Sequence, residues 1–403
     1  MKSIFKEKNI PQIDFKKIVG YLPARETNVK GKNIIPVCQP DISGNEEKYV
    51  IKAIKSSWIS SAGKYVNQFE KLFAQTVTGT RFAIATNSGT SALHTALTAC
   101  GIGPGDEVIA PAFTMIATIN AISYCGAKSV LVDADSETWN INCRRIEEKI
   151  SKKTKAIIPV HIYGLPSNMT KIRSLAKKYS LWVIEDAAEA HGAEYQGKKA
   201  GSLGDIAGFS LYANKIITTG EGGIITTDNR KLSDVCRTLI QGAFSQERHF
   251  WHKAIGFGYR MTNLQGAVGI AQVERFPDFL AKKQKIAKWY KESLMRIPGI
   301  SLQTTPPNII HGHWMNGILI DKYKFGINKN KLRRFLADNG IETRAFFIPI
   351  HWQPAYYDKY KKQRFPVAEK LCRDGLYLPS STLLTKQKID KIVQLINQAR
   401  KTK

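Results

Sequence analysis

The stretch GDIAGFSLYANKIITTGEGG, residues 204–223, decides how the rest of the chain is interpreted. Lys215 lies in it among apolar and small residues, whereas the other lysines gather on polar segments. A lysine partly withdrawn from water loses proton affinity and becomes a nucleophile for an aldehyde. Gly220, Gly222 and Gly223 permit close approach to the backbone. We interpret Lys215 as a reactive amine; the alternative is a solvated loop lysine.

The sequence around this stretch alternates short apolar runs with helical segments. Alternation of this kind predicts an α/β fold with a mostly parallel sheet, covered on both faces because its strands are continuously apolar. Ligands in such folds lie beyond the carboxyl ends of the strands. Strands are expected at 82–86, 107–111, 129–133, 156–161, 181–185, 206–211 and 223–227, and helices at 90–100, 114–124, 168–179 and 230–240.

The chain of 403 residues is long enough for a large domain and a smaller companion. Residues 1–34 are polar and basic, and we expect them to form an N-terminal extension. We assign residues 35–275 to a large ligand-binding domain and residues 276–403 to a smaller α+β domain. In the latter, helices are expected at 279–297, 329–339 and 386–400, and strands at 317–320 and 343–348.

Two further elements fall at the predicted rim of the sheet. Asn87-Ser88-Gly89-Thr90 directly precedes a helix, where backbone amides and the Thr90 hydroxyl suit a phosphate group. The alternative is an ordinary helix cap. Asp186 ends an apolar strand, and a carboxylate there is solvated, paired or functional. Facing a protonated pyridine nitrogen, it would hold the positive charge in place.

The segment WHKAIGFGYRMTN, residues 251–263, places aromatic, basic and polar groups just before an apolar helix. This density of chemical groups makes it a candidate functional element. The alternative is a packed aromatic corner in which Arg260 forms a structural ion pair.

The net charge is +27, with 8 Lys and Arg against 3 Asp and Glu in residues 1–34 and 25 against 9 in residues 276–403. Such a field attracts anionic small substrates. It is equally compatible with a general abundance of lysine on solvated faces. No zinc-finger spacing, heptad series or aromatic RNA-binding motif is present, so no nucleic-acid partner is expected.

The 6 cysteines lack Cys-x-x-Cys spacing, so we expect reduced thiols, several of them buried, and no metal site. No apolar run reaches the length of a membrane span, and the first residues lack a secretory signal. The expected compartment is the cytoplasm.

Taken together, these residues resemble the DegT/DnrJ/EryC1/StrS family of sugar aminotransferases that depend on pyridoxal 5'-phosphate (PLP). The resemblance extends over residues 34–396. It rests on the motifs WISSAGKYVNQFE (58–70), NSGTSALHTAL (87–97), GIGPGDEVIAPAFTMIATINAI (101–122), DAAEAHGAEYQGK (186–198), GDIAGFSLYANKIITTGEGG (204–223) and GYRMTNLQGAVGIAQVE (258–274).

The resemblance implies an aspartate-aminotransferase-like fold, a homodimer with active sites at the subunit interface, and bound PLP. Lys215 stands where the family links to the cofactor covalently, and its presence in place of histidine implies transamination instead of dehydration. Asp186 matches the partner of the pyridine nitrogen, and Glu189 a position beside the ring. The phosphate-binding positions match Gly89, Thr90 and Ser210.

The sequence departs from the family pattern at two positions. Met115 stands where the family has an aromatic residue stacked on the cofactor ring; a thioether still packs on a ring. Gly258 stands where an asparagine reaches the neighbouring subunit's phosphate, and Arg260 is a candidate replacement.

Within the family, residues 214–223, 241–263, 341–354 and 365–380 are most similar to members that aminate GDP-4-keto-6-deoxymannose with L-glutamate as donor. Other possibilities are a 3- or 4-aminotransferase acting on a UDP- or dTDP-linked keto sugar, or a non-catalytic binding or regulatory protein. Candidate substrate-binding residues are Arg248, His252, His313, Arg344 and His351.

Overall fold

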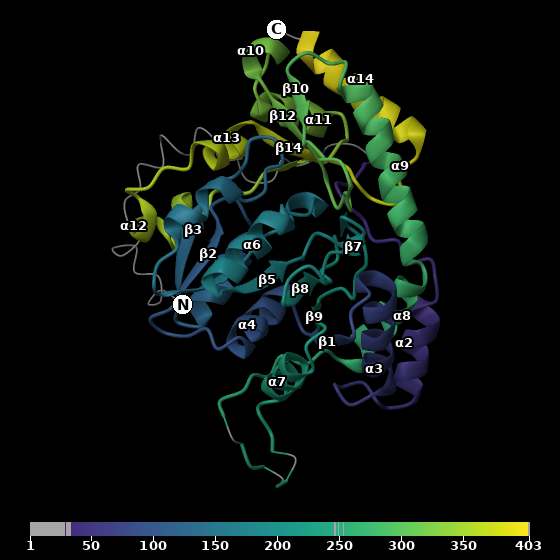
Figure 1. The fold of residues 1–403 in the computed structure, drawn as a ribbon. Coiled ribbons are helices and arrows are strands. Elements are labelled where there is room, and N and C mark those ends of the chain that lie inside the picture. Colours follow the sequence, from purple (N-terminus) through teal and green to yellow (C-terminus); the bar gives the residue numbers. More distant parts are fainter. Residues whose placement is uncertain (1–28, 30–33, 246, 249, 253, 402–403) are drawn as a thin grey trace, which may run out of the picture.

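The central element of the computed structural model is a seven-stranded sheet with the order β1-β9-β8-β5-β4-β2-β3 (Figure 1). β9 runs antiparallel to both of its neighbours, and the remaining pairs are parallel. This confirms the predicted mostly parallel sheet. Its strands are β1 (Phe82–Thr86), β2 (Glu107–Pro111), β3 (Lys128–Val132), β4 (Thr154–Ile157), β5 (Trp182–Asp186), β8 (Ile206–Ser210) and β9 (Gly223–Thr227).

The structure describes residues 29, 34–245, 247–248, 250–252 and 254–401. The predicted N-terminal extension therefore lies almost entirely outside the described residues. Among these residues, no helix combines the length and apolarity needed to cross a bilayer. All 6 cysteines are free thiols, and Cys100, Cys143, Cys236 and Cys372 are buried.

Helices cover the large sheet at the positions expected from the sequence. α4 (Gly89–Ala99) packs against β8 and β9, α6 (Met169–Tyr179) against β4 and β5, and α7 (Arg230–Ile240) against β1. Side chains of Ser88, Asn168 and Asn229 cap these helices by accepting a hydrogen bond from the amide three residues later. α5 (Ile116–Tyr124) follows β2 in the chain.

Figure 1 shows a second group of helices beside the sheet, from which α9 runs to the smaller part of the molecule. In this group α8 packs against both α2 and α3. A capping box formed by Thr262 and Gln265 fixes the start of α8. The bounds are α2 (Glu46–Lys55), α3 (Lys64–Phe73), α8 (Asn263–Glu274) and α9 (Phe276–Leu294).

The smaller part contains an antiparallel sheet with the order β10-β12-β14-β13. The expected strand at 343–348 is only Arg344–Ala345, because Phe346 leaves the strand and packs into the main core. The strands of this sheet are β10 (Ile300–Leu302), β12 (Asn316–Ile320), β13 (Arg344–Ala345) and β14 (Gly375–Leu378). The helices in this stretch of the chain are α10 (Lys322–Phe325), α11 (Lys329–Asp338), α12 (Tyr357–Tyr360), α13 (Pro366–Asp374) and α14 (Lys386–Lys401), of which α12 lies beside β3 (Figure 1). A third sheet has the order β11-β6-β7, with β6 (Glu194–Tyr195), β7 (Lys198–Lys199) and β11 (Ile309–Ile310).

The described residues form two hydrophobic clusters. The second joins α9, α11 and α14 to the small sheet, and Ile35 also belongs to it. Phe346, Phe365 and Leu371 instead pack with the core of the large sheet. Segments from both sides of residue 275 thus share each core, and the division at that residue remains a prediction.

Adjacent acidic side chains at the end of β5 have different surroundings, because successive side chains of a strand point to opposite faces. Glu185 is fully buried and accepts hydrogen bonds from the amides of Gly201, Leu203 and Gly204 at 2.9, 2.8 and 2.7 Å. His161 Nε2 lies 2.9 Å from its Oε2. Glu185 therefore fixes the segment that leads into β8.

We predict that Glu185→Leu lowers the free energy of unfolding by about 3 kcal/mol or more, because it leaves several buried amides unpaired. Denaturant unfolding of the variant and of Glu137→Leu, an exposed control, measures the difference. Equal midpoints for both variants would contradict this role.

Candidate active site

Lys215 lies in the loop that connects β8 to β9 at the rim of the large sheet. The loop is closed at its base, where Leu211 N donates to Gly222 O at 2.8 Å. The Lys215 amine lies 3.7 Å from the centroid of the Trp314 ring. Trp314 Nε1 in turn donates to Asn214 O at 2.8 Å. Trp314 thus holds both the backbone and the amine of this loop in place.

The surroundings of Lys215 favour its neutral form. Burial lowers the pKa of Lys215 below its ordinary value, while the carboxylates of Glu189 and Asp186 oppose the change. More of the amine is therefore unprotonated at neutral pH than for a solvated lysine. The structure thus favours the reactive-amine interpretation over the solvated alternative.

Asp186 ends β5 and is 5% exposed. Its Oδ2 accepts a hydrogen bond from the Thr118 hydroxyl at 2.6 Å, and its Oδ1 accepts one from Ala188 N at 3.2 Å. Burial raises the pKa of Asp186, whereas these hydrogen bonds and the Lys215 charge lower it. A buried carboxylate held in this way is a site for a positively charged group.

Glu189 adds a second carboxylate to this cluster. It is 4% exposed, and its Oε2 accepts a hydrogen bond from Tyr163 N at 2.7 Å. Burial raises the pKa of Glu189 to about 7, against the opposing charge of Lys215. The half-buried Lys215 and the buried Asp186 and Glu189 therefore form one cluster whose charges influence one another.

The start of α4 meets the Lys215 loop. A Cβ on Gly89 would lie 2.9 Å from Ser210 Cβ, and one on Gly223 would lie 2.2 Å from Ser88 O. Only glycine permits this approach. The first amides of α4 and the Thr90 hydroxyl thus lie beside Ser210, as expected for a phosphate site at a helix start.

Met115 and Arg260 have exposed side chains, and each adjoins a segment of the site. Met115 is 49% exposed and caps α5, whose first turn carries Thr118. The backbone of Arg260 pairs with Thr86, directly before Asn87. Arg260 is exposed, and no ion pair of it is seen among the described residues.

Of the candidate substrate residues, His313 directly precedes Trp314, whose ring contacts the Lys215 amine. Its ring stacks on that of His311 with centroids 3.9 Å apart. Burial lowers the pKa of His313 to about 4, which leaves a neutral imidazole. Arg344 pairs with Glu342 at 2.7 Å, and Glu342 accepts the amide of Val37.

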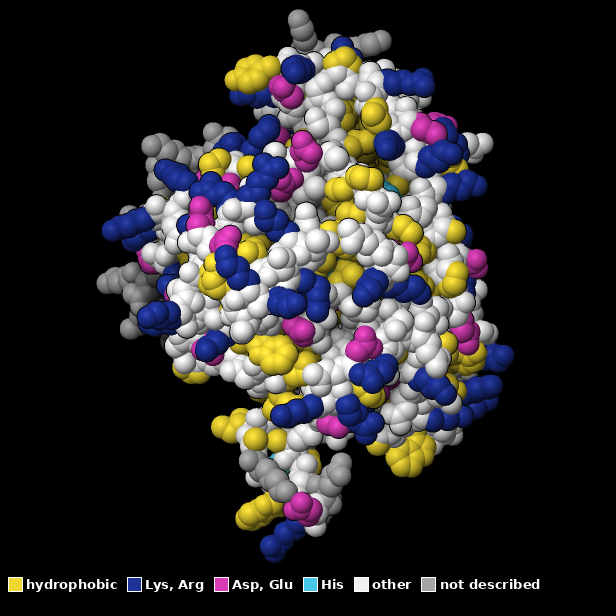
Figure 2. All heavy atoms as spheres, viewed as in Figure 1, with side chains coloured by type: hydrophobic (Ala, Val, Ile, Leu, Met, Phe, Trp, Pro, Cys, Tyr) yellow, Lys and Arg dark blue, Asp and Glu magenta, His cyan; other side chains and the backbone are white. Residues whose placement is uncertain are grey.

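Arg248 and His252 belong to a projecting loop that extends from the end of α7 (Figure 1) and whose described residues are 244–245, 247–248, 250–252 and 254–255. Both side chains are exposed, and the Arg248 guanidinium lies 5.7 Å from the Trp251 ring centroid. Neither contacts Lys215 within this chain. Phe250, Trp251 and Ile255 are also exposed, by 74%, 56% and 90%, and Figure 2 shows apolar side chains on this projection.

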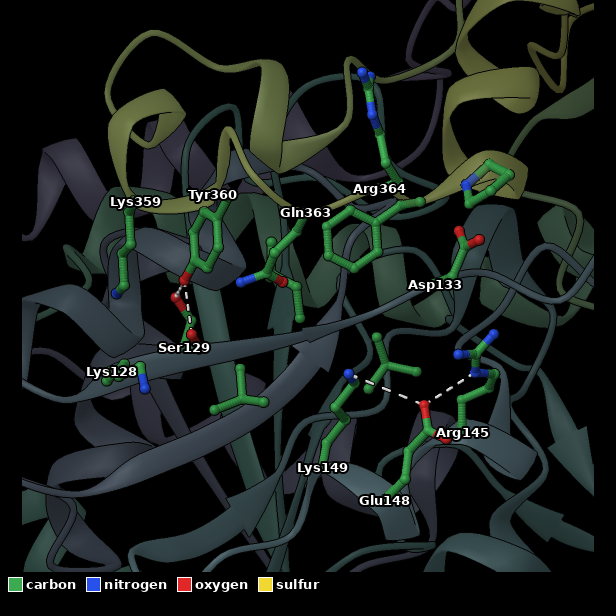
Figure 3. A pocket seen from close by; sticks show the side chains of 15 residues that line it. Lys128, Ser129, Asp133, Arg145, Glu148, Lys149, Lys359, Tyr360, Gln363 and Arg364 are labelled. Atoms are coloured by element: carbon green, nitrogen blue, oxygen red, sulfur yellow. Dashed lines mark hydrogen bonds and ion pairs between the residues drawn. The ribbon is translucent and has the colours of Figure 1, made fainter.

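His351 lies apart from the cluster. It is buried, pairs with Glu369 at 3.2 Å and contacts the ring of Phe365. Phe365 lines a different cavity, of about 370 Å³, at the free edge of β3 (Figure 3). The carboxylates there are already engaged, Glu148 by Arg145 and Asp133 by backbone amides. None of the residues proposed from the sequence lines this cavity.

Thr118 and Trp314 are the site residues that sequence reasoning missed. Thr118 lies three positions after Met115, so helix periodicity could have placed it on the same side of α5. Trp314 has no comparable local signal, because only tertiary structure brings it from another segment to Lys215.

The arrangement fits PLP on three observations. The start of α4 and Ser210 form a cradle that a side chain on Gly89 would fill. Asp186 offers a buried negative charge suited to a protonated ring nitrogen, and Lys215 an amine of lowered pKa. In addition, the Oδ1 atom of Asn214 is buried and has no partner among the described residues.

Sequence comparison relates the chain to named proteins over nearly its whole length. It is 43% identical over 364 residues to GDP-perosamine synthase of Escherichia coli O157:H7, covering 90% of this chain and 98% of that protein. It is 43% identical over 368 residues to GDP-perosamine synthase of Caulobacter vibrioides, with coverage of 90% and 98%.

Structural comparison agrees. The crystal structure of DesV from S. venezuelae superposes with a TM-score of 0.86 at 29% identity, covering 92% of this chain and 100% of that one. The aminotransferase from Psychrobacter cryohalolentis gives 0.84 at 29%, with coverage of 89% and 97%. The sequence profile of the DegT/DnrJ/EryC1/StrS aminotransferase family matches residues 40–397. The chain therefore belongs to this family and is a PLP-dependent aminotransferase that acts on a nucleotide sugar.

Proposed function

We propose that this enzyme aminates the keto carbon of GDP-4-keto-6-deoxymannose, with L-glutamate as the amino donor, to give GDP-perosamine. The observation that carries the proposal is the 43% identity, over 98% of their length, to two proteins named GDP-perosamine synthase. The buried cluster of Lys215, Asp186 and Glu189 supports catalysis and argues against a non-catalytic binding protein on the same fold.

Lys215 has the central part in this proposal. When bound, PLP supplies an aldehyde that carries the amino group between donor and acceptor, and a ring that accepts electrons. The Lys215 amine would hold the cofactor and, when free, could act as general base and acid on the reacting carbon. Its lowered pKa suits both tasks, because the amine gives up its proton more readily than a solvated lysine does.

The remaining residues bind and orient the cofactor. Asp186, whose charged form the Thr118 hydroxyl stabilises, would hold the positive charge of the ring nitrogen. Gly89, Thr90 and Ser210 would bind the phosphate group at the start of α4. Glu189 and Met115 would contact the ring. Trp314 packs on Lys215 and shields one side of its amine.

We further propose a homodimer in which the projecting loop, residues 244–255, completes the partner's active site. A loop that carries exposed Phe250, Trp251 and Ile255 outside the body of a monomer exposes apolar surface typical of an interface. Arg248 and His252 on this loop would then reach the nucleotide-sugar substrate of the partner subunit, and Arg260 its phosphate. Arg344, His313 and His351 remain candidates for substrate contact from the same chain.

A panel of nucleotide keto sugars tests the substrate. We expect glutamate-dependent amination of GDP-4-keto-6-deoxymannose at least tenfold faster than that of UDP- or dTDP-linked 3- or 4-keto sugars, measured by mass spectrometry of the products. Lys215→Ala is the control and should lose activity and the visible absorption of bound PLP. Preference for a UDP or dTDP sugar would refute the GDP assignment while leaving the aminotransferase intact.

Thr118→Val tests the role of Asp186. Loss of the hydroxyl removes a hydrogen bond to a buried carboxylate, which is worth about 1.5–3 kcal/mol. We therefore expect PLP affinity to fall about tenfold or more, measured by titration of the cofactor-free enzyme. Thr98→Val is the matched control, because the Thr98 hydroxyl donates to His94 O within α4. Equal affinities for the two variants would disprove the role.

Mixing inactive variants tests the subunit arrangement. Lys215→Ala and the double variant Arg248→Ala/His252→Ala should each be inactive. After denaturation and refolding together, activity should return to about a quarter of the wild-type value, because half of the dimers are mixed and each has one intact site. A mixture as inactive as its parents would show that the loop serves its own chain.

A further inference from the structure

Lys283, on α9, is a buried cation outside the cluster described above. Its side chain is 2% exposed. The amine donates to Trp314 O at 2.7 Å and also to Ser380 O. Within the described part of the chain, no carboxylate pairs with it. Burial lowers the pKa of Lys283 to about 8, while Cys38 opposes this change. A buried cation with carbonyl partners alone is costly, which calls for an explanation.

The two carbonyl groups lie next to adjacent ends of two neighbouring strands of the small sheet. Trp314 lies just before β12, and Ser380 lies just after β14. The strands are further joined here, because Asn316 N donates to Ser380 Oγ at 3.0 Å. Lys283 thus fixes α9 to the end of this strand pair, at the point where Trp314 leaves it.

Direct contacts continue from Trp314 to the reactive lysine. Its ring covers the Lys215 amine at 3.7 Å, and its Nε1 donates to Asn214 O at 2.8 Å. The Cys38 thiol donates to the same carbonyl at 3.2 Å. The position of the Trp314 backbone, which Lys283 holds, therefore decides how closely the ring covers Lys215.

We propose that Lys283 is a positioning residue: by binding the Trp314 carbonyl, it keeps the Trp314 ring against Lys215 and limits the access of water to the Lys215 amine. The inference rests on the proposed role of Lys215. Withdrawal of Trp314 would admit water and favour the ammonium form, because burial is the main influence on this amine. Loss of the ring's attraction for a cation acts in the opposite sense. A rise of the Lys215 midpoint therefore requires the gain in hydration to exceed that loss.

Lys283→Met tests the proposal, since methionine keeps the length of the side chain and removes the amine. The readout is reductive methylation of Lys215 in the cofactor-free enzyme, followed across pH by peptide mass spectrometry. We expect the midpoint for Lys215 to rise by about one pH unit, so that its reactivity below the midpoint falls about tenfold. Lys283→Arg, which retains the charge and donors, should restore most of the reactivity.

Lys329→Met is the matched control. Lys329 is 3% exposed, burial lowers its pKa to about 8, and its amine donates to Cys372 O, so it is also a buried lysine with a carbonyl partner. It lies on α11, and no contact with Trp314 is seen among the described residues. The control should melt at a lower temperature, as Lys283→Met should, but leave the Lys215 midpoint unchanged.

The outcomes separate this inference from the proposed function. Equal Lys215 midpoints in wild type, Lys283→Met and Lys329→Met would overturn the inference and make Lys283 purely structural. If Lys283→Met does not fold, Trp314→Phe, which has a smaller ring and loses the bond to Asn214, tests directly whether Trp314 controls Lys215: an unchanged midpoint opposes the inference. Retention of the bound-PLP absorption in Lys215→Ala would instead refute the proposed role of Lys215, whatever the midpoints.

Discussion

The site depends on the closeness of a half-buried amine to two buried carboxylates. Lys215 lies beside Asp186 and Glu189, so each charge influences the others. The fold provides this by ending β5 and β8 at the same rim and by placing Trp314 over the amine. Solvated side chains of the same types would titrate independently, and their ordinary pKa values lie far from neutral pH.

Much of the fold follows from local sequence pattern. The apolar runs at 82–86, 107–111 and 223–227 are strands with those bounds, because continuous burial on both faces leaves few alternatives for them. The run at 343–348 shows the limit of such reasoning. Phe346 and its neighbours are apolar enough for a strand, yet they pack against Tyr163 in the main core, a partner far away in the sequence.

The site was predictable to a similar extent. Sequence motifs predict Lys215, Asp186 and the start of α4, because each of them places a polar or charged group in a distinctive local sequence. They do not reveal Trp314 or Lys283, because an aromatic ring or a lysine in an ordinary helix has no distinctive pattern until tertiary contacts are known. Arg248 and His252 illustrate a further limit: under the proposed homodimer they would serve the partner's site, and neither the sequence nor a single chain brings them to Lys215.

The antiparallel course of β9 has a geometric consequence. A connection between parallel strands must cross to the opposite end of the strands before the next strand begins. The segment after Ser210 does not: it leaves and re-enters the sheet at the same strand end, where Leu211 and Gly222 are hydrogen-bonded. Because β9 is reversed, a short closed loop replaces a crossover connection. This loop holds Lys215 beyond the carboxyl end of β8, where ligands bind in folds of this kind.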